Sequence, residues 1–325
     1  MESQDKDSWS SDIDALNDLQ KFNTRLSRLP RFKIRNRITP IALQSLLKIS
    51  QIGSGRKLTK QGLKAENRRV TVDDQSVALR IIRPLGSIKG IVIDFHGGGW
   101  VIGNAQMNDD LNAKMAIECE VAVISVNYRL AVWTPIESII SDCLCAARWA
   151  LSTSEFKDLP AIVVGESAGG HLAVATLLRL KAYPDLLTRV SGALLYYGVF
   201  DLTGTDSVRN AGPETLVLDG PGMVEALRLL TPGLTDEERR RPCLSPLYGD
   251  LQGFPPALMF AGELDPLRDD TQALAAKWRM SSAVEAHVVP HAPHGLIHFP
   301  TKMATKVIKY SHAWIRTQLA ASSLA

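Results

Sequence analysis

A serine flanked by small residues stands where an apolar run gives way to a helical pattern. The apolar run covers residues 161–164, the segment GESAGG follows at 165–170, and helical spacing of apolar residues continues to Leu180. A strand that turns sharply into a helix leaves no room for side chains beside the serine, which explains the glycines at 165 and 169. The turn exposes the Ser167 hydroxyl beside helix N-terminal N–H groups, where negative charge is favoured. We therefore predict that Ser167 is a nucleophile; a glycine-rich turn with an incidental serine is the alternative.

A second cluster of glycines follows another apolar run. The segment HGGGW occupies residues 96–100, directly after the run 91–95. Consecutive glycines let backbone N–H groups converge on a small anion without obstruction by side chains. We interpret the segment as an oxyanion hole, with a flexible loop as the alternative, and expect His96 to brace it by hydrogen bonding. His171, one turn into the helix after the serine, is expected to be structural.

A serine hydroxyl needs a base, and the base needs an orienting carboxylate. In hydrolases with such a nucleophile turn, the three residues follow the order Ser, Asp or Glu, His. Asp265 comes just after the apolar run 257–260, at the carboxyl end of a predicted strand, where loops carry function. Glu263, Asp269 and Asp270 compete with it, but they are interpreted as loop residues or as residues that favour the start of the next helix. Asp265 is the predicted acid.

Four of the seven histidines fall between positions 287 and 298. Two prolines within this segment break any helix that would align the imidazoles, and neither acidic residues nor cysteines accompany them, so no metal site is expected. One of these histidines is instead interpreted as the general base. His294, followed by glycine, is the predicted base, His291 is the fallback, and His298 is expected to pack at the start of the last helix.

These motifs need a scaffold that brings them together. Eight short apolar or β-branched runs occur at about residues 70–72, 77–82, 91–95, 121–126, 161–164, 193–197, 257–260 and 284–289. From residue 91 onward they alternate with helical segments at 108–119, 136–151, 167–180, 271–280 and 301–319. Such alternation predicts an α/β fold with a mostly parallel eight-stranded sheet covered by helices on both faces. The first two runs have no helix between them and are expected to form an antiparallel edge.

Two further segments are helical and have no place in this alternation. Residues 12–50 have helix-like apolar spacing, and Pro30 and Pro40 divide them into at least two helices. Residues 203–245 interrupt the alternation with glycine, proline and charged residues plus a helical pattern at 223–230. We predict an N-terminal helical cap region at 1–60 and a catalytic domain at 61–325, with a cap insertion at about 203–245.

Composition limits the other classes of function. A formal net charge of +3, from 37 basic and 34 acidic residues, gives no strong field for nucleic acid or a membrane, so neither partner is expected. The N-terminal segment is acidic and polar, unlike a signal peptide, and no apolar run approaches the length of a membrane span. The four cysteines, Cys119, Cys143, Cys145 and Cys243, lack metal-binding spacing and are expected to be buried free thiols. A cytoplasmic location is the expectation.

In its motifs the chain resembles the bacterial hormone-sensitive-lipase-like esterases, which have the α/β-hydrolase fold. The motifs follow the family's order over roughly residues 65–320: HGGGW at 96–100, YRLA at 128–131, GESAGG at 165–170, DPLRD at 265–269 and HG at 294–295. The resemblance implies a triad of Ser167, Asp265 and His294, and an oxyanion hole made by the N–H groups of Gly98, Gly99 and Ala168. It also implies an N-terminal helical cap, hydrolysis of short- to medium-chain acyl esters without a cofactor, and often a homodimer.

The sequence departs from this family at two positions. Glu166 stands where most members have Asp, at a position that supports the site, so the chemistry is expected to be retained. Val132-Trp133 replaces the usual Pro-Glu after YRLA, a change that bears on the path of this loop and on substrate preference. We expect Trp100 and Phe200 to bind substrate, with core or cap packing as the alternative for each.

The predicted function is that of a serine carboxylic-ester hydrolase that works through an acyl-enzyme and acts on a small-molecule ester. An amidase, a formamidase or a lactone hydrolase with the same triad is the nearest alternative. A ligand receptor on a hydrolase scaffold is an alternative from another class, but a receptor would be expected to have lost the serine or the histidine. Acyl transfer to an alcohol in place of water also stays open.

Overall fold

One eight-stranded sheet organises the chain. The computed structural model describes residues 9–31, 38–51 and 53–322. The strand order is β1-β2-β4-β3-β5-β6-β7-β8, with bounds β1 (Leu63–Val72), β2 (Gln75–Pro84), β3 (Gly90–Phe95), β4 (Val121–Asn127), β5 (Ala161–Glu166), β6 (Val190–Tyr196), β7 (Ala257–Gly262) and β8 (Val284–Val289). All eight predicted runs are strands. β1 and β2 pair antiparallel and β2 pairs antiparallel with β4, whereas the other pairs are parallel, so the prediction of an antiparallel edge is confirmed.

The central strands are buried along their whole length and mostly apolar, because both faces of the sheet are covered. Every residue of β3, β5 and β7 is buried, as expected for parallel strands between two helical layers. Successive side chains of β3 pack on opposite faces of the sheet: Ile93 belongs to one hydrophobic cluster and Val92 to the other. The sheet therefore has two cores, and the ends of its strands are held rigidly.

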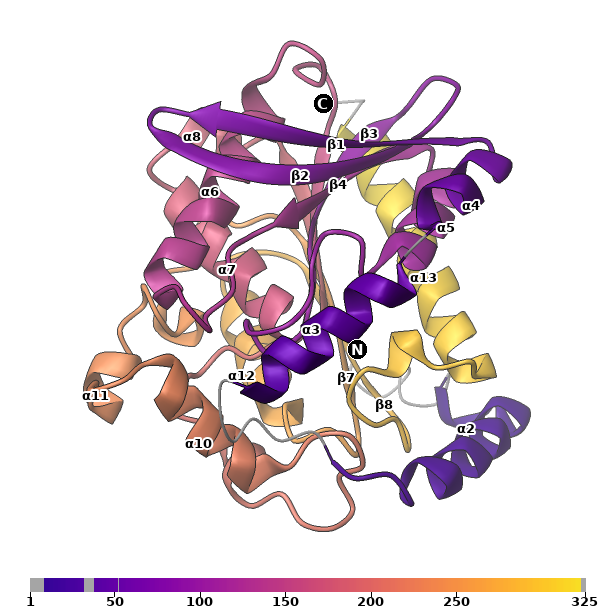
Figure 1. The fold of residues 1–325 in the computed structure, drawn as a ribbon, viewed down its shortest axis with the longest axis vertical. Helices are drawn as coiled ribbons and strands as arrows, with labels where there is room; N and C mark the ends of the chain where they lie inside the picture. The colour runs from indigo at the N-terminus through magenta and orange to yellow at the C-terminus, as the bar shows by residue number, and fades with distance from the viewer. Residues whose placement is uncertain (1–8, 32–37, 52, 323–325) are drawn as a thin grey trace.

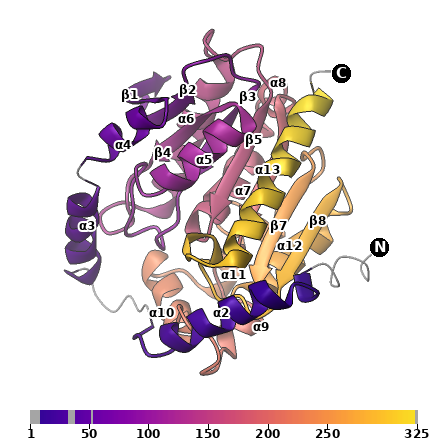
Figure 2. The same cartoon turned by 90° about the vertical axis from the view of Figure 1, so that its right-hand side faces the viewer.

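Helices cover both faces, as predicted. α6 (Ile136–Ser152), α7 (Ala168–Leu180) and α12 (Arg268–Trp278) contribute to one cluster. α5 (Asp109–Cys119) and α13 (Lys302–Ser322) contribute to the other, and Figure 2 shows these two lying across the near face of the sheet. The short elements are α8 (Pro184–Leu187), η1 (Pro246–Tyr248) and η2 (Leu296–His298).

Among the described N-terminal residues, three longer helices come before the sheet. They are α2 (Ile13–Leu26), α3 (Ile38–Ser50) and α4 (Ser54–Lys60). Pro30 follows α2 and Pro40 lies in the first turn of α3, so these prolines separate helices as predicted. α2 packs against α13. The side-chain amide of Gln44 on α3 donates to the carbonyl of Gly103 at 2.9 Å and accepts its N–H at 2.8 Å, which joins α3 to the loop that follows β3.

Between β6 and β7 the chain leaves the sheet for α9 (Asp206–Arg209), α10 (Gly220–Leu230) and α11 (Asp236–Arg239). The predicted helical pattern at 223–230 is α10. Figure 1 places α10 and α11 at the lower left, with α3 crossing the front of the molecule above them. These helices lie at the end of the molecule toward which the parallel strands direct their carboxyl ends.

The prediction for the cysteines is correct for three of the four. Cys119, Cys143 and Cys145 are buried free thiols, but Cys243 is exposed. It lies in the turn after α11, directly after the exposed Arg241 and Pro242. No described helix combines the length and the apolar character needed to cross a bilayer.

Candidate functional site

The predicted nucleophile lies in a strained turn between β5 and α7. Ser167 has φ 52° and ψ −122°, and its N–H donates to the carbonyl of Tyr196 at 2.9 Å. A Cβ at Gly165 would lie 2.3 Å from the carbonyl oxygen of Gly169, and a Cβ at Gly169 would lie 1.9 Å from that of Phe95. The prediction that the turn demands glycine at both positions is therefore confirmed. Strain of this kind at a single serine is a frequent mark of a functional site.

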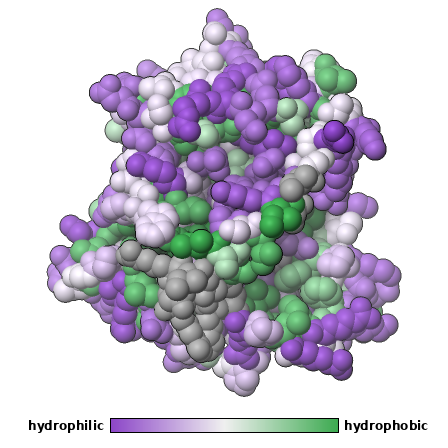
Figure 3. Space-filling model, in the orientation of Figure 1, coloured by the Kyte–Doolittle hydropathy of each residue, from purple (hydrophilic) through white to green (hydrophobic). Residues whose placement is uncertain are grey.

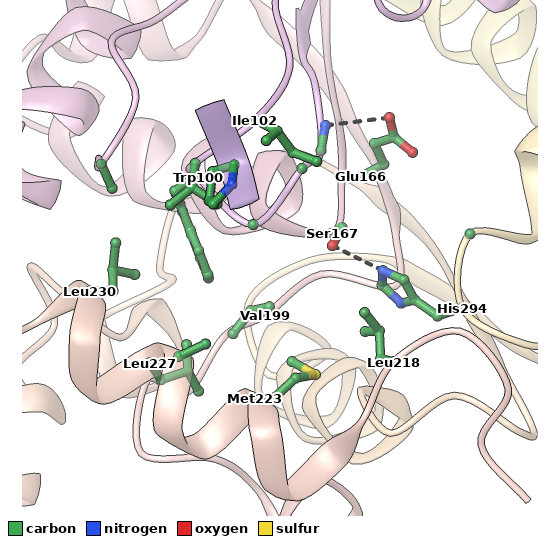
Figure 4. A pocket seen from close by; sticks show the side chains of 18 of the residues that line it. Trp100, Ile102, Glu166, Ser167, Val199, Leu218, Met223, Leu227, Leu230 and His294 are labelled. Atoms are coloured by element: carbon green, nitrogen blue, oxygen red, sulfur yellow. Dashed lines mark hydrogen bonds between the residues drawn. The ribbon is translucent and has the colours of Figure 1, made fainter. Parts of the chain in front are cut away.

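The structure brings the predicted nucleophile, base and acid into one chain of contacts. His294 Nε2 is 3.0 Å from Ser167 Oγ, and His294 Nδ1 is 2.9 Å from Asp265 Oδ2. Because a carboxylate can only accept, Nδ1 carries the hydrogen and Nε2 accepts the serine hydroxyl. Asp265 is fully buried and His294 is nearly so. Figure 4 shows the histidine directed at the serine.

The loop that carries the acid and the loop that carries the base are in direct backbone contact. Asp265 follows β7, and His294 follows β8. The N–H of Leu264 donates to the carbonyl of Ala292 at 2.9 Å, and a Cβ at Gly262 would lie 2.1 Å from that same oxygen. The ring of Tyr197 meets the His294 imidazole edge-on, with centroids 4.7 Å apart. Both side chains are thus held by backbone contacts and by packing.

The other histidines of this segment have different surroundings. His291 lies outside the cavity wall, with its backbone N–H donating to Glu263 at 2.8 Å. His298 does not simply pack against the last helix, as predicted: its Nε2 contacts the carboxylate of Glu166. Local sequence gave no sign of this pair, because its members stand 132 positions apart. Within the described residues no group of three His, Cys, Asp or Glu side chains is placed to hold a metal ion.

The glycine loop after β3 faces the serine. Gly98 and Gly99 have φ 104° and 60°, which turns their peptides into conformations that favour glycine. Among the described residues, neither glycine nor Ala168, the first residue of α7, donates its N–H to an acceptor. Three donors are thus available beside the Ser167 hydroxyl. Such donors can stabilise a negatively charged oxygen.

His96 braces this loop, as expected. Its Nδ1 lies 2.8 Å from the carbonyl of Gly97 and 3.0 Å from the hydroxyl of Tyr128, on whose ring it stacks. Burial lowers the pKa of His96 to about 4, so it stays neutral near pH 7. His171 is structural as expected: its Nδ1 accepts the indole N–H of Trp100 at 3.3 Å, and its Nε2 lies 2.7 Å from the carbonyl of Leu244.

Glu166 joins several parts of the site. Its carboxylate accepts the N–H of Gly97 at 3.3 Å, the amide of Asn108 at 2.9 Å and the hydroxyl of Tyr197 at 3.1 Å, and it contacts His298. Burial acts to raise the pKa of Glu166, but the charge of His298 and these hydrogen bonds outweigh it and lower the pKa to about 2. For His298, burial acts to lower the pKa, and the charge of Glu166 outweighs it, so the net shift is upward.

A cavity of about 470 Å³ opens from the serine. Ser167, His294, Glu166 and His298 lie in its wall; most of the remaining wall is apolar and includes Pro40 of α3, Trp100, Ile102, Val132, Val199, Met223, Leu227 and Leu230. Figure 4 shows the α10 side chains opposite Trp100 and Ile102. Figure 3 shows hydrophobic side chains in a band across the middle of this face of the molecule. The size and the walls are those of a small-molecule site.

Two sequence expectations about this cavity have different outcomes. Trp100 lies in the wall as predicted, but Phe200 is completely buried and is absent from the wall. The prediction that Phe200 binds substrate is wrong, because its ring packs beneath Gly198, where a Cβ would lie 2.3 Å from it. In the segment after YRLA, where the sequence differs from the family pattern, Val132 lines the cavity, whereas Trp133 is 74% exposed.

Asp270 has a role that the sequence did not reveal. It lies in the first turn of α12, as expected, but it is fully buried and accepts the N–H groups of Phe200 at 2.6 Å and Asp201 at 3.0 Å. Burial raises the pKa of Asp270 to about 7. The contacts fix the loop after β6, which also carries Tyr197 and Val199 to the cavity.

Comparisons with known proteins agree with the fold. A family model described as alpha/beta hydrolase fold matches residues 92–298. The carboxylesterase NlhH of Mycobacterium tuberculosis is 32% identical over 219 residues, which cover 64% of this chain and 67% of that protein. Esterase LipW from Mycobacterium marinum shares the fold with a TM-score of 0.80 at 23% identity, over 94% of this chain and 97% of that one.

An esterase of the bacterial hormone-sensitive lipase family also shares the fold, with a TM-score of 0.71 at 23% identity over 94% of this chain and 98% of that one. The chain belongs to the α/β-hydrolase family.

Proposed function

We propose that this enzyme is a serine carboxylesterase that hydrolyses short- to medium-chain acyl esters of small alcohols. The observation that supports this most strongly is the unbroken series of contacts from Asp265 through His294 to Ser167, which ends in a largely apolar cavity. An apolar wall suits an acyl chain, and a nucleophile with an oriented base suits attack on the acyl carbon.

The reaction proceeds in two steps. Ser167 Oγ attacks the ester carbonyl while His294 Nε2 takes its proton, and Asp265 stabilises the imidazolium that forms. The C–O bond to the alcohol then breaks, and His294 returns the proton to the departing oxygen. Water, deprotonated by the same nitrogen, attacks the acyl-enzyme and releases the acid and the free serine. Because a protonated His294 cannot accept the serine proton, the rate falls in acid.

The oxyanion of each tetrahedral intermediate is held by the N–H groups of Gly98, Gly99 and Ala168. All three are available donors, and Ala168 adds the partial positive charge of the α7 N-terminus. Removing one such donor typically raises the barrier by about 2.7–4 kcal/mol. Because the donors belong to the backbone, their positions depend on the path of the glycine loop.

α3 and α10 are proposed to form a cap over the acyl site. Pro40 of α3 and Met223, Leu227 and Leu230 of α10 contribute apolar side chains to the cavity wall. The titratable side chains of the wall are Glu166, Tyr197, His294 and His298. Each is bonded to another of them or to Ser167 and Asp265, so none offers an unpaired charge to an acyl chain. Neutral, apolar acyl groups are therefore the preferred substrates.

Hydrolysis of p-nitrophenyl esters from acetate to decanoate, by wild type and Ser167→Ala in parallel, tests the proposal. Turnover that peaks at a short or medium chain and disappears in the variant is the expected result. Matched p-nitroanilides separate an esterase from an amidase, because amines are the poorer leaving groups. Faster turnover of the anilides would replace the ester assignment, and activity that survived in Ser167→Ala would contradict the nucleophile.

A further inference from the structure

Several segments that carry the proposed chemistry meet at one carboxylate. Glu166 precedes the nucleophile, accepts the N–H of Gly97 from the glycine loop and contacts His298 from the loop of the base. It also accepts the hydroxyl of Tyr197, whose ring rests on His294. The nucleophile turn, the oxyanion loop and the base loop are therefore joined through a single side chain.

His298 is the partner of Glu166 that carries a charge. It stands four residues after His294, in η2, and its side chain is 35% exposed in the cavity wall. The charges that act on it come from Glu166 at the end of β5 and Asp94 on β3. α13 packs against η2, and its His312 borders the small internal pocket that Glu166 and Asp94 also border. His294 lies in the same cavity wall as His298.

The charge states favour an ion pair. The low pKa of Glu166 keeps its carboxylate ionised, and the raised pKa of His298 extends its charged form toward neutral pH. Asp94 is bonded to Asn112 and Ser125, so Glu166 is the carboxylate in direct contact with His298. The pair is shielded from water on the Glu166 side, where only 6% of the side chain is exposed.

We infer that His298 is a positioning residue: paired with Glu166, it holds the base loop and the oxyanion loop in register with Ser167. The inference rests on the proposed esterase activity. Glu166 accepts the N–H of the His96–Gly97 peptide, and the Gly98 N–H, an oxyanion donor, belongs to the next peptide along the chain. Loss of the charge on His298 loosens that arrangement without removing a group that acts on the reacting atoms. A displacement of about 1 Å in such a site can lower the rate by about 10²-fold.

The test compares His298→Gln, which keeps a donor but no charge, with His298→Lys, which keeps a charge. kcat and KM for p-nitrophenyl butyrate are measured from about pH 5 to about pH 10. The kcat of wild type should fall as pH rises and His298 loses its proton. His298→Gln should have a low kcat that shows no such fall at high pH, and its KM should change little. His298→Lys should retain activity at high pH, because an ammonium stays charged to about pH 10.

Two further variants complete the comparison. Glu166→Gln removes the pair from the other side, and the double variant with His298→Gln should be no slower than the slower single variant. His291→Gln is the matched control, because this histidine lies on the same loop but outside the cavity wall, and its profile should follow wild type. The inference would be overturned if His298→Gln kept the wild-type kcat and the same fall in kcat at high pH.

Two measurements separate this inference from the proposed function. Nuclear magnetic resonance titration of the His298 ring in folded wild type should give a midpoint above about pH 6.5. A midpoint at or below that pH would show that His298 and Glu166 form no ion pair, and would overturn the inference. Diethyl p-nitrophenyl phosphate transfers its phosphoryl group to Ser167 Oγ, with release of p-nitrophenolate and transfer of the serine proton to His294. It needs the same machinery but no carboxylic ester.

If wild type is phosphorylated but hydrolyses no ester, the proposed substrate class fails and the phosphorylation rates still decide the role of His298. Slower phosphorylation of His298→Gln than of wild type and His291→Gln supports the inference. Equal rates overturn it. If wild type is not phosphorylated at all, the nucleophile assignment and the inference fail together.

Discussion

Nδ1 of His294 lies 2.9 Å from Oδ2 of Asp265, whose side chain is completely buried. The other carboxylate oxygen accepts the N–H of Leu267 at 2.8 Å, so the carboxylate cannot rotate without losing a hydrogen bond. The imidazole is therefore held in the tautomer that leaves Nε2 able to accept the Ser167 hydroxyl. One buried aspartate thus determines what the nitrogen on the far side of the ring can do.

Asp265→Asn should lower kcat by about 10⁴-fold with little change in KM, because an amide at this position no longer selects that tautomer. The measurement is turnover of p-nitrophenyl butyrate by the purified variant. Asp269→Asn, in the first turn of α12 with its carboxylate bonded to the Ser207 N–H, is the control and should keep nearly the wild-type rate. A loss smaller than about tenfold in Asp265→Asn would contradict the assignment of the acid.

Gly98→Ala should nearly abolish turnover. The residue has φ 104°, and a Cβ there would lie 2.1 Å from the carbonyl oxygen of Ile102, so the loop must move and its N–H donors move with it. A loss of about 10²–10³-fold in kcat is expected, as for removal of one oxyanion donor. Gly86→Ala is the matched control, since a Cβ there meets nothing within 4 Å. Wild-type kcat in Gly98→Ala would show that the glycine loop does not hold the oxyanion.

The parts of the molecule that sequence predicted correctly are those set by local geometry or by burial on both faces. The turn at Ser167 demands glycine at 165 and 169 because backbone oxygens fill the space of a Cβ, and such a demand is visible in the residue types. The runs that form β3 and β5 are buried throughout and mostly apolar because two layers of helices cover them. Both signals depend on neighbours in the chain or on the class of fold.

The parts that sequence missed depend on which distant segments meet. Phe200 lies in the loop after β6 and was predicted to bind substrate, but its N–H donates to the buried Asp270 and its side chain is completely buried. His298, in η2, was expected to pack, yet it contacts Glu166 at the end of β5. Asn108 also bonds to Glu166, and nothing in its local sequence marks it. Such contacts depend on the order of strands in the sheet, and the apolar segments that predict the strands do not define that order.

The His298–Glu166 pair should make the free energy of unfolding depend on pH. Because the pKa of Glu166 is lowered to about 2, its contribution is fully present above the unfolded value of about 4.3 and is lost as pH falls. Because the pKa of His298 is raised, its contribution is fully present below about 6.5 and is lost as pH rises through the raised value. The pair therefore stabilises the fold most between about pH 4.3 and 6.5.

Urea unfolding of wild type and His298→Gln at about pH 5.5 and about pH 9 measures this dependence. The variant should be less stable by about 1.5–3 kcal/mol at the lower pH, the usual range for a hydrogen bond to a charged group, and by less at the higher pH. His291→Gln, whose side chain is 44% exposed, should match wild type at both. An equal deficit at the two pH values would mean that His298 stabilises the fold by packing alone.

Met223→Trp should shorten the acyl chain that the enzyme accepts. Met223 lies on α10 in the cavity wall, opposite the glycine loop and near His294 (Figure 4), so a larger ring there fills space that a long chain would occupy. kcat/KM for the decanoate ester should fall by about 10-fold or more, because each lost methylene contact costs about 1–3 kcal/mol. Turnover of the acetate ester should change little. Met280→Trp, at a side chain that is 86% exposed, controls for the added ring and should leave the chain-length profile unchanged. If Met223→Trp lowered the rates for acetate and decanoate equally, α10 would contribute to the positioning of the ester group and not to the acyl site.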